Sequence, residues 1–472
     1  MEKIIPVYYS EYGRYINRFR AIPSFIDGLK PVERRLLLTL HEVAQKDEKS
    51  AKVVGTALGN YHPHGDGSCY GTLVNLENQG FALGQGNWGA PGLVDSPAAA
   101  YRYTEIRLEK WVEESAFEYI KHVPWEEIEY SPEPLYIPCP VPLGLVGDGV
   151  ITGISFYRTM IPKYKFSDLA KRLVWLLDTT QPEIIIQPNS KDCHLQEVTP
   201  GDFKKILTEG SGSINYIPHG GIENNIIKIL GRAPNTSFVR KKEDEEKKRK
   251  RKVLKDCEDE LNVKLLEGNQ KTKKKTTEIT KPSIHIIIEP QKRGMDLQAL
   301  GTKIWYDYLI KKTNFSCLFC DNEGKVKVYG IDEILMLNYV CWKYAVKTKC
   351  IDDYNKLSNR RVDLMVIQII RHIFEQYKST KVEDIINKYH ELKKTVDISI
   401  EIEIFNIDTD KWSKEIKQIS DQDIIDICNK RSIKNLIETV IDTQKVEQEL
   451  ISARSLIDNN EKNCFDHVKK LR

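Results

Sequence analysis

Arg102 and Tyr103 are neighbours whose side chains together suit nucleophilic chemistry. A tyrosine oxygen can attack an electrophilic centre and hold the product as a covalent intermediate. Because free tyrosine has a pKa of about 10, nearby groups must favour its phenolate form, and the adjacent arginine supplies a permanent positive charge. The competing interpretation of this pair alone is a strand tyrosine whose hydroxyl makes a structural hydrogen bond.

His62 and His64, separated by Pro63, are a second candidate set. Imidazoles can accept a proton or neutralise developing charge, and two histidines at this spacing can also bind a metal. The intervening proline and the lack of a nearby third ligand disfavour a metal.

Cys317 and Cys320 form the one close pair among ten cysteines. We expect strand thiols there rather than a metal or redox site, and reduced thiols in a cytosolic setting.

The elements expected to position these residues begin with two short helices. Leucines at helical spacing after Pro31 predict a buried helix over residues 34–41. Residues 51–59 predict another short helix that is ended by a glycine. Two short helices joined by a turn, each carrying basic residues, fit a helix-turn-helix or winged-helix unit.

The middle of the chain has a different pattern. Prolines between Pro132 and Pro142 indicate an irregular connection, and residues 184–186 and 284–288 are β-like, so we expect a mixed α and β domain. It carries a basic insertion, Arg240 to Pro282. That insertion is either a solvated hairpin or loop, or an electrostatic arm for DNA phosphates.

The last third is expected to be mostly helical. Apolar side chains recur there at steps of three and four in two stripes, Val362, Met365, Val366, Ile369, Ile370 and Ile373, then Ile433, Leu436, Ile437, Val440, Val446, Leu450, Ala453 and Ile457. They predict long amphipathic helices packed as a hairpin or coiled coil, and ordinary buried helices fit the same pattern.

Length and charge set outer limits. A chain of 472 residues is expected to form two to four domains. Its 71 basic and 68 acidic residues give a net charge of +3, so only local clustering of cations would indicate nucleic-acid binding. The sequence has no apolar run of roughly 18 residues and no secretory signal, so we expect no membrane association and a cytoplasmic location.

The most informative stretch holds six motifs in a fixed order. They are Arg20-Ala21-Ile22-Pro23, Asp27-Gly28-Leu29-Lys30-Pro31-Val32-Glu33-Arg34-Arg35, Lys49-Ser50-Ala51-Lys52-Val53-Val54-Gly55, Tyr61-His62-Pro63-His64-Gly65-Asp66-Gly67, Gly84-Gln85-Gly86-Asn87-Trp88-Gly89 and Ala99-Ala100-Tyr101-Arg102-Tyr103-Thr104-Glu105-Ile106-Arg107. In this order and spacing they resemble the A subunits of gyrase and topoisomerase IV, which are type IIA DNA topoisomerases. The resemblance is strong to about residue 110 and looser beyond it.

The resemblance implies a role for each candidate residue. Tyr103 would be the nucleophile that breaks the DNA backbone, with Arg102 as its catalytic partner. A phosphotyrosine bond would keep the phosphodiester energy for rejoining the strand. Arg20, His62 and His64 fall where the family has residues near the scissile phosphate.

Further positions are implied to contact DNA. The family's DNA-binding helices carry cations at positions that here are Lys30, Arg34, Arg35 and Lys52, and clustered cations would repel each other without an anionic partner. The isoleucine that wedges into DNA would be Ile154, with Ile151 as the alternative. Gly67 and Gly71 stand where the family often has a serine and an acidic residue that hold a quinolone's metal-bound water, which predicts weak quinolone sensitivity.

The resemblance also implies an assembly. A double-strand break needs two tyrosines, so a homodimer around double-stranded DNA is expected. The family keeps Mg2+ and the ATPase on a separate B-type subunit, so both cofactors are expected on that partner in an A2B2 enzyme. The implied fold is α+β and multi-domain. Residues 1–125 would form an N-terminal arm and a winged-helix domain, 126–330 a tower-like α/β domain with the insertion at 240–282, and 331–472 a helical coiled-coil dimer gate.

Two other functions remain to be distinguished from this one. A strand-nicking nuclease of the HUH type would also combine His-x-His with a tyrosine, but it needs the histidines on a strand, and residues 62–67 have the pattern of a loop. A non-catalytic winged-helix DNA-binding scaffold is the non-enzyme alternative.

Two further expectations concern activity and source. The chain stops soon after the predicted long helix, which favours relaxation or decatenation over supercoiling. Its lysine- and isoleucine-rich composition suggests a phage or viral source.

Overall fold

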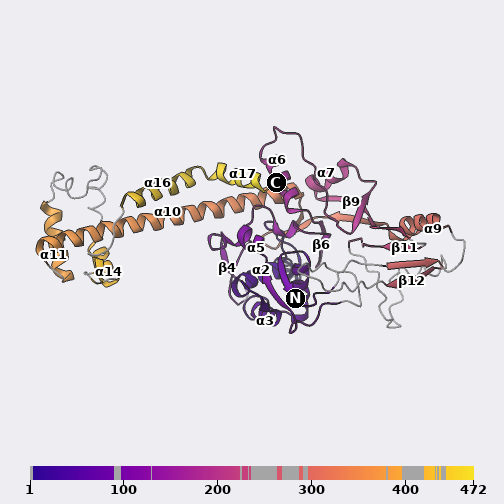
Figure 1. The fold of residues 1–472 in the computed structure, drawn as a ribbon, viewed down its shortest axis with the longest axis horizontal. Coiled ribbons are helices and arrows are strands. Elements are labelled where there is room, and N and C mark those ends of the chain that lie inside the picture. The colour runs from indigo at the N-terminus through magenta and orange to yellow at the C-terminus, as the bar shows by residue number, and fades with distance from the viewer. Residues whose placement is uncertain are drawn as a thin grey trace. The chain divides into compact units, whose positions relative to one another are not determined.

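The computed structural model describes residues 4–89, 97–128, 130–223, 226–231, 233–234, 263–267, 286–290, 296–378, 381–395, 419–430, 432, 435–436 and 443–471 (Figure 1). The chain divides into two compact units, a first unit of Met1–Ala345 with Cys464–Arg472 and a second unit of Val346–Asn463. Helices and small sheets of antiparallel strands make up the described residues, which confirms the mixed α and β class.

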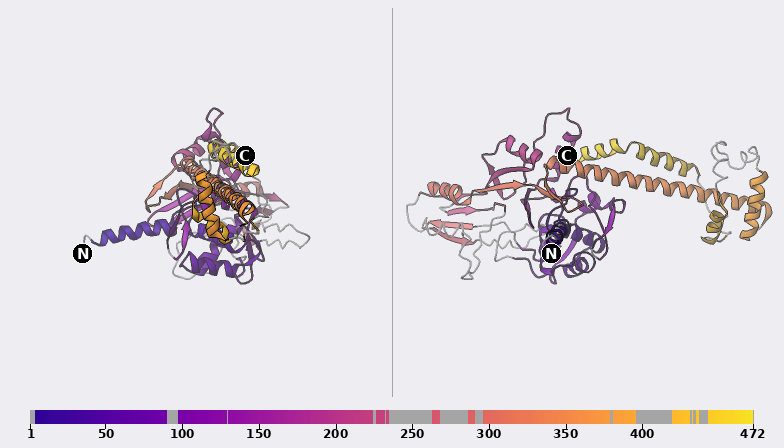
Figure 2. Two further views of the ribbon diagram at one scale, coloured as in Figure 1. Left: turned by 90° about the vertical axis from the view of Figure 1, so that its left-hand side faces the viewer. Right: turned by 180° about the vertical axis from the view of Figure 1, so that it is seen from behind.

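The first unit opens with helix α1 (Ile4–Ile16), which continues into the π-helical turn η1 (Asn17–Ala21). Figure 2 shows α1 extending from the remainder of this unit. The helix contacts Phe156, whose ring lies 3.1 Å from where a Cβ at Gly13 would stand. A larger residue than glycine there would have to displace that ring.

Helix α2 (Pro31–Val43) carries the leucine-rich face. Pro31 stands at its first turn, and the Glu33 carboxylate accepts a hydrogen bond from the backbone N–H of Lys30 at 2.9 Å, so a donor at the helix start is satisfied. The leucines of this helix are fully buried, which confirms the helix predicted over residues 34–41.

Helices α3 (Ser50–Asn60) and α4 (Asp66–Asn78) pack with α2. α3 confirms the helix predicted over residues 51–59, but the prediction that a glycine ends it is wrong. Gly59 lies inside the last turn, and the chain leaves the helix at Tyr61, whose N–H donates to the Ala57 carbonyl oxygen at 3.0 Å.

A small sheet in the order β1-β3-β2 completes this part of the unit. It consists of β1 (Glu48–Lys49), β2 (Ala82–Gln85) and β3 (Glu105–Leu108). Along β3 the side chains alternate, and Ile106 and Leu108 are buried. The central strand of the sheet therefore begins two residues after Tyr103.

Short elements then lead to the next sheet. They are α5 (Lys110–Val112), η2 (Glu113–Phe117), η3 (Ile120–His122), β4 (Trp125–Glu127), β5 (Pro132–Pro134) and η4 (Leu143–Leu145). The irregular connection predicted from Pro132 to Pro142 is confirmed apart from β5. Gly144 packs so closely on Gly28 that a Cβ on Gly144 would stand 1.9 Å from the Gly28 carbonyl oxygen. This approach joins the connection to the segment before α2.

A five-stranded sheet has the order β6-β7-β14-β9-β8. Its strands are β6 (Val150–Ile154), β7 (Arg158–Pro162), β8 (Cys193–Gln196), β9 (Ser211–Pro218) and β14 (Lys311–Ser316). Helices α6 (Phe166–Leu177) and α7 (Pro200–Glu209) belong to the same region. The Thr199 hydroxyl accepts from the Asp202 N–H at the start of α7, and the left-handed Gly210 ends that helix.

A second sheet has the order β10-β11-β13-β12. Its strands are β10 (Gly220–Glu223), β11 (Ile226–Ile229), β12 (Val263–Glu267) and β13 (Ile286–Pro290). β13 confirms the described part of the strand predicted over 284–288. The basic insertion from Arg240 to Pro282 lies outside the described residues except for β12. Helix α9 (Leu297–Lys303), η5 (Ile304–Leu309) and the hairpin of β15 (Leu318–Cys320) and β16 (Val326–Val328) complete the region.

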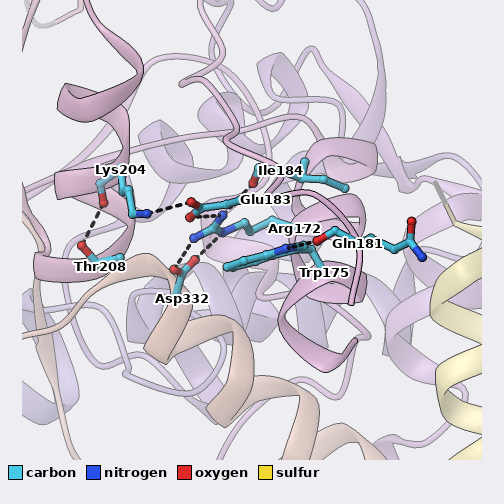
Figure 3. Close-up of polar contacts among 8 residues, drawn as sticks. All are labelled: Arg172, Trp175, Gln181, Glu183, Ile184, Lys204, Thr208 and Asp332. Atoms are coloured by element: carbon cyan, nitrogen blue, oxygen red, sulfur yellow. Dashed lines mark hydrogen bonds and ion pairs between the residues drawn. The ribbon is translucent and has the colours of Figure 1, made fainter. Parts of the chain in front are cut away.

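The strand predicted over residues 184–186 is wrong, because this segment has no strand partner. Figure 3 shows its surroundings. The Ile184 carbonyl oxygen instead accepts from Arg172 Nη1 at 2.7 Å. Arg172 also donates to both oxygens of Asp332, at 2.9 and 2.7 Å, and lies over the Trp175 ring. A buried guanidinium thus ties α6 and this extended segment to the start of the next helix.

That helix is α10 (Ile331–Tyr377), whose first part belongs to the first unit. The C-terminal helix α17 (Asn460–Lys470) returns to it, with the His467 ring 5.4 Å from the ring of Trp342. Burial lowers the pKa of His467. No helix among the described residues is long and apolar enough to cross a membrane.

The second unit contains the rest of α10 with α11 (Val382–Thr395), α14 (Asp421–Lys430) and α16 (Thr443–Asp458). Its core includes Met365, Val366, Ile369, Ile370 and Ile373 of the first predicted stripe, with Val362 partly buried against it. Leu436 of the second predicted stripe also belongs to this core, together with Ile367, Ile385, Tyr389, Ile419, Ile424 and Ile427. Val446, Leu450 and Ala453 of α16 are buried as predicted. Ile433, Ile437 and Val440 lie outside the described residues. The domain boundaries at 125 and 330 stay predictions.

Candidate active site on the turn before β3

Tyr103 lies on a turn that leads into β3, and its side chain is 65% exposed. The Tyr103 backbone N–H donates to the Ala100 carbonyl oxygen at 2.8 Å, which closes the turn. The Arg102 guanidinium lies over the Tyr103 ring, 4.6 Å from its centroid. The two predicted catalytic neighbours therefore touch each other on the surface, where a DNA phosphate could reach both.

The end of this turn is fixed by a buried side chain. Thr104 Oγ1 and Ser50 Oγ share a hydrogen bond of 2.8 Å, and the Ser50 backbone N–H donates to the Thr104 carbonyl oxygen at 3.0 Å. Ser50 is the first residue of α3, so the turn is attached directly to a helix of the N-terminal bundle. Neither residue was singled out from the sequence, because their pairing joins positions 54 apart.

His62 and His64 stand on the loop between α3 and α4, with their rings edge-to-face and the centroids 4.6 Å apart. Arg20 is exposed on η1 and lies near enough to contribute to the lowered pKa of His62. The structure therefore brings together three of the residues predicted to act at the phosphate. The Tyr101 hydroxyl donates to Asp66 Oδ2 at 3.3 Å, which links the end of the histidine loop to the Tyr103 turn.

His62 is buried and its Nδ1 faces Arg35 Nη1 at 3.1 Å. An arginine can only donate, so His62 Nδ1 is the acceptor and the ring hydrogen of the neutral imidazole stands on Nε2. Burial, followed by the charges of Arg35, His64 and Arg20, lowers the pKa of His62 to about 4. His62 is therefore a neutral Nε2–H donor at neutral pH rather than a cation.

Arg35 is only 1% exposed, and its Nε donates to Glu133 Oε2 at 2.8 Å. Its guanidinium is thus held between a buried carboxylate and the imidazole of His62. The sequence had placed Arg35 among the DNA-binding cations. The structure instead gives it internal partners, and Glu133 is a residue that the sequence reasoning missed.

Arg34 and Lys52, two of the other predicted DNA-binding cations, also have carboxylate partners. Arg34 donates to both oxygens of the buried Asp27, at 2.8 and 3.0 Å. Burial lowers the pKa of Arg34, but the Asp27 carboxylate raises it overall. On the surface, Lys52 pairs with Glu48 at 2.6 Å. The expectation that these cations would repel without an external anion is therefore wrong, because the chain supplies its own anions.

Lys30, the remaining predicted DNA-binding cation, directly precedes α2, and its side chain is half-buried.

The two isoleucines considered as the DNA wedge differ in exposure. Ile154 ends β6 and its side chain is 73% exposed, whereas Ile151 on the same strand is 4% exposed. The two candidates for the wedge therefore face opposite ways, as the odd spacing along a strand requires. Only Ile154 can reach an external partner without unfolding the strand.

A metal site is not formed by the described residues, in which no three His, Cys, Asp or Glu side chains come together. His194 Nε2 and His219 Nδ1 lie 2.8 Å apart at the edge of the five-stranded sheet. Cys317 and Cys320 are both buried, and burial raises the pKa of each thiol. They stand beside or within strands, in keeping with the expectation of strand thiols.

Comparison with known proteins gives the family. The family model for the A subunit of DNA gyrase and topoisomerase IV matches residues 20–465. The chain therefore belongs to this family, as its motifs predicted.

Curated relatives agree with the family. The chain is 29% identical to the A subunit of DNA topoisomerase 4 from Haemophilus influenzae over 357 residues, which are 69% of this chain and 44% of the relative. It is 34% identical to the A subunit of DNA topoisomerase 4 from Salmonella typhimurium over 233 residues, covering 44% and 30%. It is 37% identical to the A subunit of DNA gyrase from Neisseria gonorrhoeae over 196 residues, covering 37% and 20%. The matches span less than half the length of each of these relatives.

Proposed function

We propose that this chain is the DNA-cleaving subunit of a type IIA topoisomerase and that Tyr103 is its nucleophile. The observation that carries the proposal is the exposed Tyr103 beside Arg102 on an anchored turn, in a chain that belongs with the A subunits of gyrase and topoisomerase IV. The Tyr103 oxygen would lose its proton and attack a DNA phosphorus. The 3′ oxygen would leave as a hydroxyl, so the 5′ end stays on the tyrosine until the reverse attack rejoins the strand.

The neighbouring residues would act on the same phosphate. Arg102 and Arg20 are exposed cations that can neutralise charge on the phosphoryl oxygens. His62 would donate a hydrogen bond from Nε2, and His64 would contact the phosphate beside it. Arg35, which is buried, would position His62 rather than touch DNA.

The wider surface would hold a bent duplex. Lys30 and Lys52 would contact phosphates of the DNA on a winged-helix surface formed by α2, α3 and the small sheet, whereas Arg34, held by the buried Asp27, would support this surface from within. Ile154 would insert between base pairs and bend the duplex. Because such binding releases counterions, we expect affinity for DNA to fall steeply with salt.

The assembly would be a homodimer with two tyrosines, one for each strand. We assign residues 1–125 to the arm and winged-helix domain, 126–330 to a tower-like domain that supports the DNA, and 331–472 to a helical dimer gate.

The double-strand break would let a second duplex pass, so that the enzyme would relax or decatenate DNA in the cytoplasm. The basic insertion at 240–282 would add a phosphate-binding arm.

Mg2+ and ATP would belong to a separate B-type subunit in an A2B2 complex. The described residues of this chain do not fit a metal site, since no three candidate ligands come together and His62 Nδ1 is engaged by Arg35. The same observation disfavours an HUH-type nuclease, which needs both histidines as ligands. A non-catalytic scaffold would not need an exposed tyrosine and arginine in contact.

The test is covalent cleavage of plasmid DNA by the wild-type chain and by Tyr103→Phe, each mixed with candidate B-type subunits, Mg2+ and ATP. We expect linear DNA with protein on its 5′ ends from the wild type and none from the variant. Single-strand nicking without a partner would support the nuclease instead. No covalent product with any partner would leave a DNA-binding scaffold.

A further inference from the structure

Tyr70 joins both ends of the short segment that carries Arg102 and Tyr103. Its hydroxyl donates to the Ala99 carbonyl oxygen at 2.7 Å and lies 3.0 Å from Thr104 Oγ1. Ala99 precedes the turn and Thr104 follows it. One hydroxyl group on α4 therefore spans the base of the loop on which the nucleophile stands.

The ring of Tyr70 is held in place from two sides. It meets the Tyr101 ring edge-to-face, with centroids 5.7 Å apart, and the Trp88 ring at 6.0 Å. Burial raises the pKa of Tyr70, whereas the hydrogen bond with Thr104 opposes this. The hydroxyl therefore keeps its proton and remains a donor to the Ala99 carbonyl oxygen at neutral pH.

The backbone of this turn has to define where the Tyr103 oxygen lies, because most of that side chain is in solvent. Removing the Tyr70 hydroxyl would leave the end at Thr104 held by Ser50, whereas the end at Ala99 would keep only its backbone N–H bond to the Asn87 carbonyl oxygen, at 2.8 Å. The carbonyl side of Ala99 would then have no side-chain anchor, so the backbone of the turn would be less closely defined at this end. An error of about 1 Å in the place of a reacting atom can lower a rate by roughly 100-fold.

We propose that Tyr70 is a positioning residue for Tyr103, acting through its hydrogen bonds to the two ends of the 99–104 segment. The inference rests on the proposed function, in which Tyr103 attacks DNA. Tyr70 touches neither the phosphate nor the reacting oxygen in this role. Its removal should therefore reduce the rate of attack and leave DNA affinity unchanged.

The first experiment compares Tyr70→Phe with Tyr101→Phe in the free full-length chain. Tyr101→Phe is the matched control, because it also removes one tyrosine hydroxyl next to the turn but breaks only the contact with Asp66. Limited trypsin digestion measures the rate of cutting after the exposed Arg102. We expect faster cutting in Tyr70→Phe than in the wild type and the control, with the same melting temperature to within a few degrees.

The second experiment uses the complex with its B-type partner and measures formation of the covalent product on normal DNA and on DNA with sulfur in place of the leaving 3′ oxygen. A sulfur leaving group needs no proton, so a residue that acts on the leaving group would lose its importance there. A positioning residue for the nucleophile would not. We expect Tyr70→Phe to lower the rate by about 10- to 100-fold on both substrates, with unchanged DNA affinity.

Ser50→Ala is a second variant, which removes the side-chain hydrogen bond between Ser50 and Thr104 at the other end of the segment. It should lower the rate of covalent product formation on both substrates, but by less than Tyr70→Phe does. Equal trypsin and cleavage rates for Tyr70→Phe and Tyr101→Phe would overturn this inference alone. A defect of Tyr70→Phe confined to normal DNA would also overturn it. Absence of a Tyr103-linked product from the wild-type complex would overturn the proposed function and this inference together.

Discussion

Arg35 Nη1 donates a hydrogen bond to His62 Nδ1 over 3.1 Å, while its Nε donates to Glu133. All three side chains are buried. Because the guanidinium occupies Nδ1, a proton can be added to His62 only by breaking this contact or by placing two cations face to face. The imidazole therefore presents a fixed Nε2–H and does not serve as a base at neutral pH.

We predict that the imidazole of His62 stays neutral at neutral pH. In the unfolded chain a histidine titrates at about pH 6.5, whereas in the folded protein the pKa of His62 is lowered to about 4. Between these values the unfolded state binds more protons, so this group makes the fold less stable as pH falls from 6.5 to 4. NMR of histidine-labelled protein should show a neutral Nε2–H tautomer at pH 6.

His62→Gln is the matching variant, because its amide can donate a hydrogen bond but does not titrate. We expect it to reduce the acid sensitivity of the unfolding midpoint between pH 6.5 and 4. An imidazole of His62 that titrates at about 6.5 or above would show that Arg35 does not hold it neutral.

Asp27 should be among the most important residues for the stability of the first unit. Its carboxylate is fully buried and accepts from Arg34, from the backbone N–H of Leu29 at 3.1 Å and from that of Ile137 at 3.1 Å. Replacing Asp27 with alanine leaves the arginine charge without its partner, and such losses amount to about 3–5 kcal/mol. Chemical denaturation followed by circular dichroism would measure it.

Asp47→Ala is the control for that experiment. Asp47 pairs with Arg107 at 2.9 Å on the surface, where both side chains are partly exposed, so its removal should change stability by about 1 kcal/mol or less. If both variants lose the same stability, the buried carboxylate does not have the structural role assigned to it.

Gly67 and Gly71 should make the enzyme weakly sensitive to quinolones. Both lie on α4, and a Cβ added to either meets no atom within 4 Å. The double variant Gly67→Ser, Gly71→Asp therefore has room for both side chains. If the added oxygens together contribute about 1.4 kcal/mol of binding, the drug concentration that gives half-maximal cleavage should fall about tenfold.

The wild-type complex and the variant would be compared in the same plasmid cleavage assay, with Gly67→Ala, Gly71→Ala as the control for helix formation. Alanine adds a methyl group and no oxygen, so this control should keep the wild-type response to the drug. Ordinary quinolone potency in the wild type would contradict the prediction.

The helices of the N-terminal region could be predicted because their signals are local. Leucines at helical spacing and Pro31 at the first turn are contained within α2 itself. Residues 184–186 were misread as a strand because their isoleucines have the composition of one. Their backbone is instead satisfied in part by the Arg172 side chain of a preceding helix, which no pattern within the three residues reveals.

The candidate site divides in the same way. Tyr103 and Arg102 are adjacent in sequence and in space, so their motif alone could predict their contact, and their catalytic roles stay predictions. The residues that hold the site together are paired across long separations, 98 positions between Arg35 and Glu133 and 29 between Tyr70 and Ala99. A single sequence carries no signal for such pairs, so the family resemblance that implies a DNA contact for Arg35 gives no indication of its buried partners.

Ile154 and Ile151 allow a direct test of the wedge, because they are the same residue type on the same strand with opposite surroundings. Ile154→Ala removes an exposed side chain, so stability should change by about 0.5 kcal/mol or less. Ile151→Ala leaves a cavity in the core and should destabilise the protein by about 2–5 kcal/mol.

DNA bending can be measured by energy transfer between the ends of a short duplex. It should be lost in Ile154→Ala and kept in Ile151→Ala at temperatures where the Ile151→Ala protein is folded. If Tyr103 is the nucleophile as proposed, reduced bending should also lower the yield of cleaved DNA, because a straight duplex would not bring the phosphate to it. Normal bending by Ile154→Ala would remove this residue as the wedge, whereas loss of bending in both variants would point to the antiparallel pair of β6 and β7 as a whole rather than to one side chain.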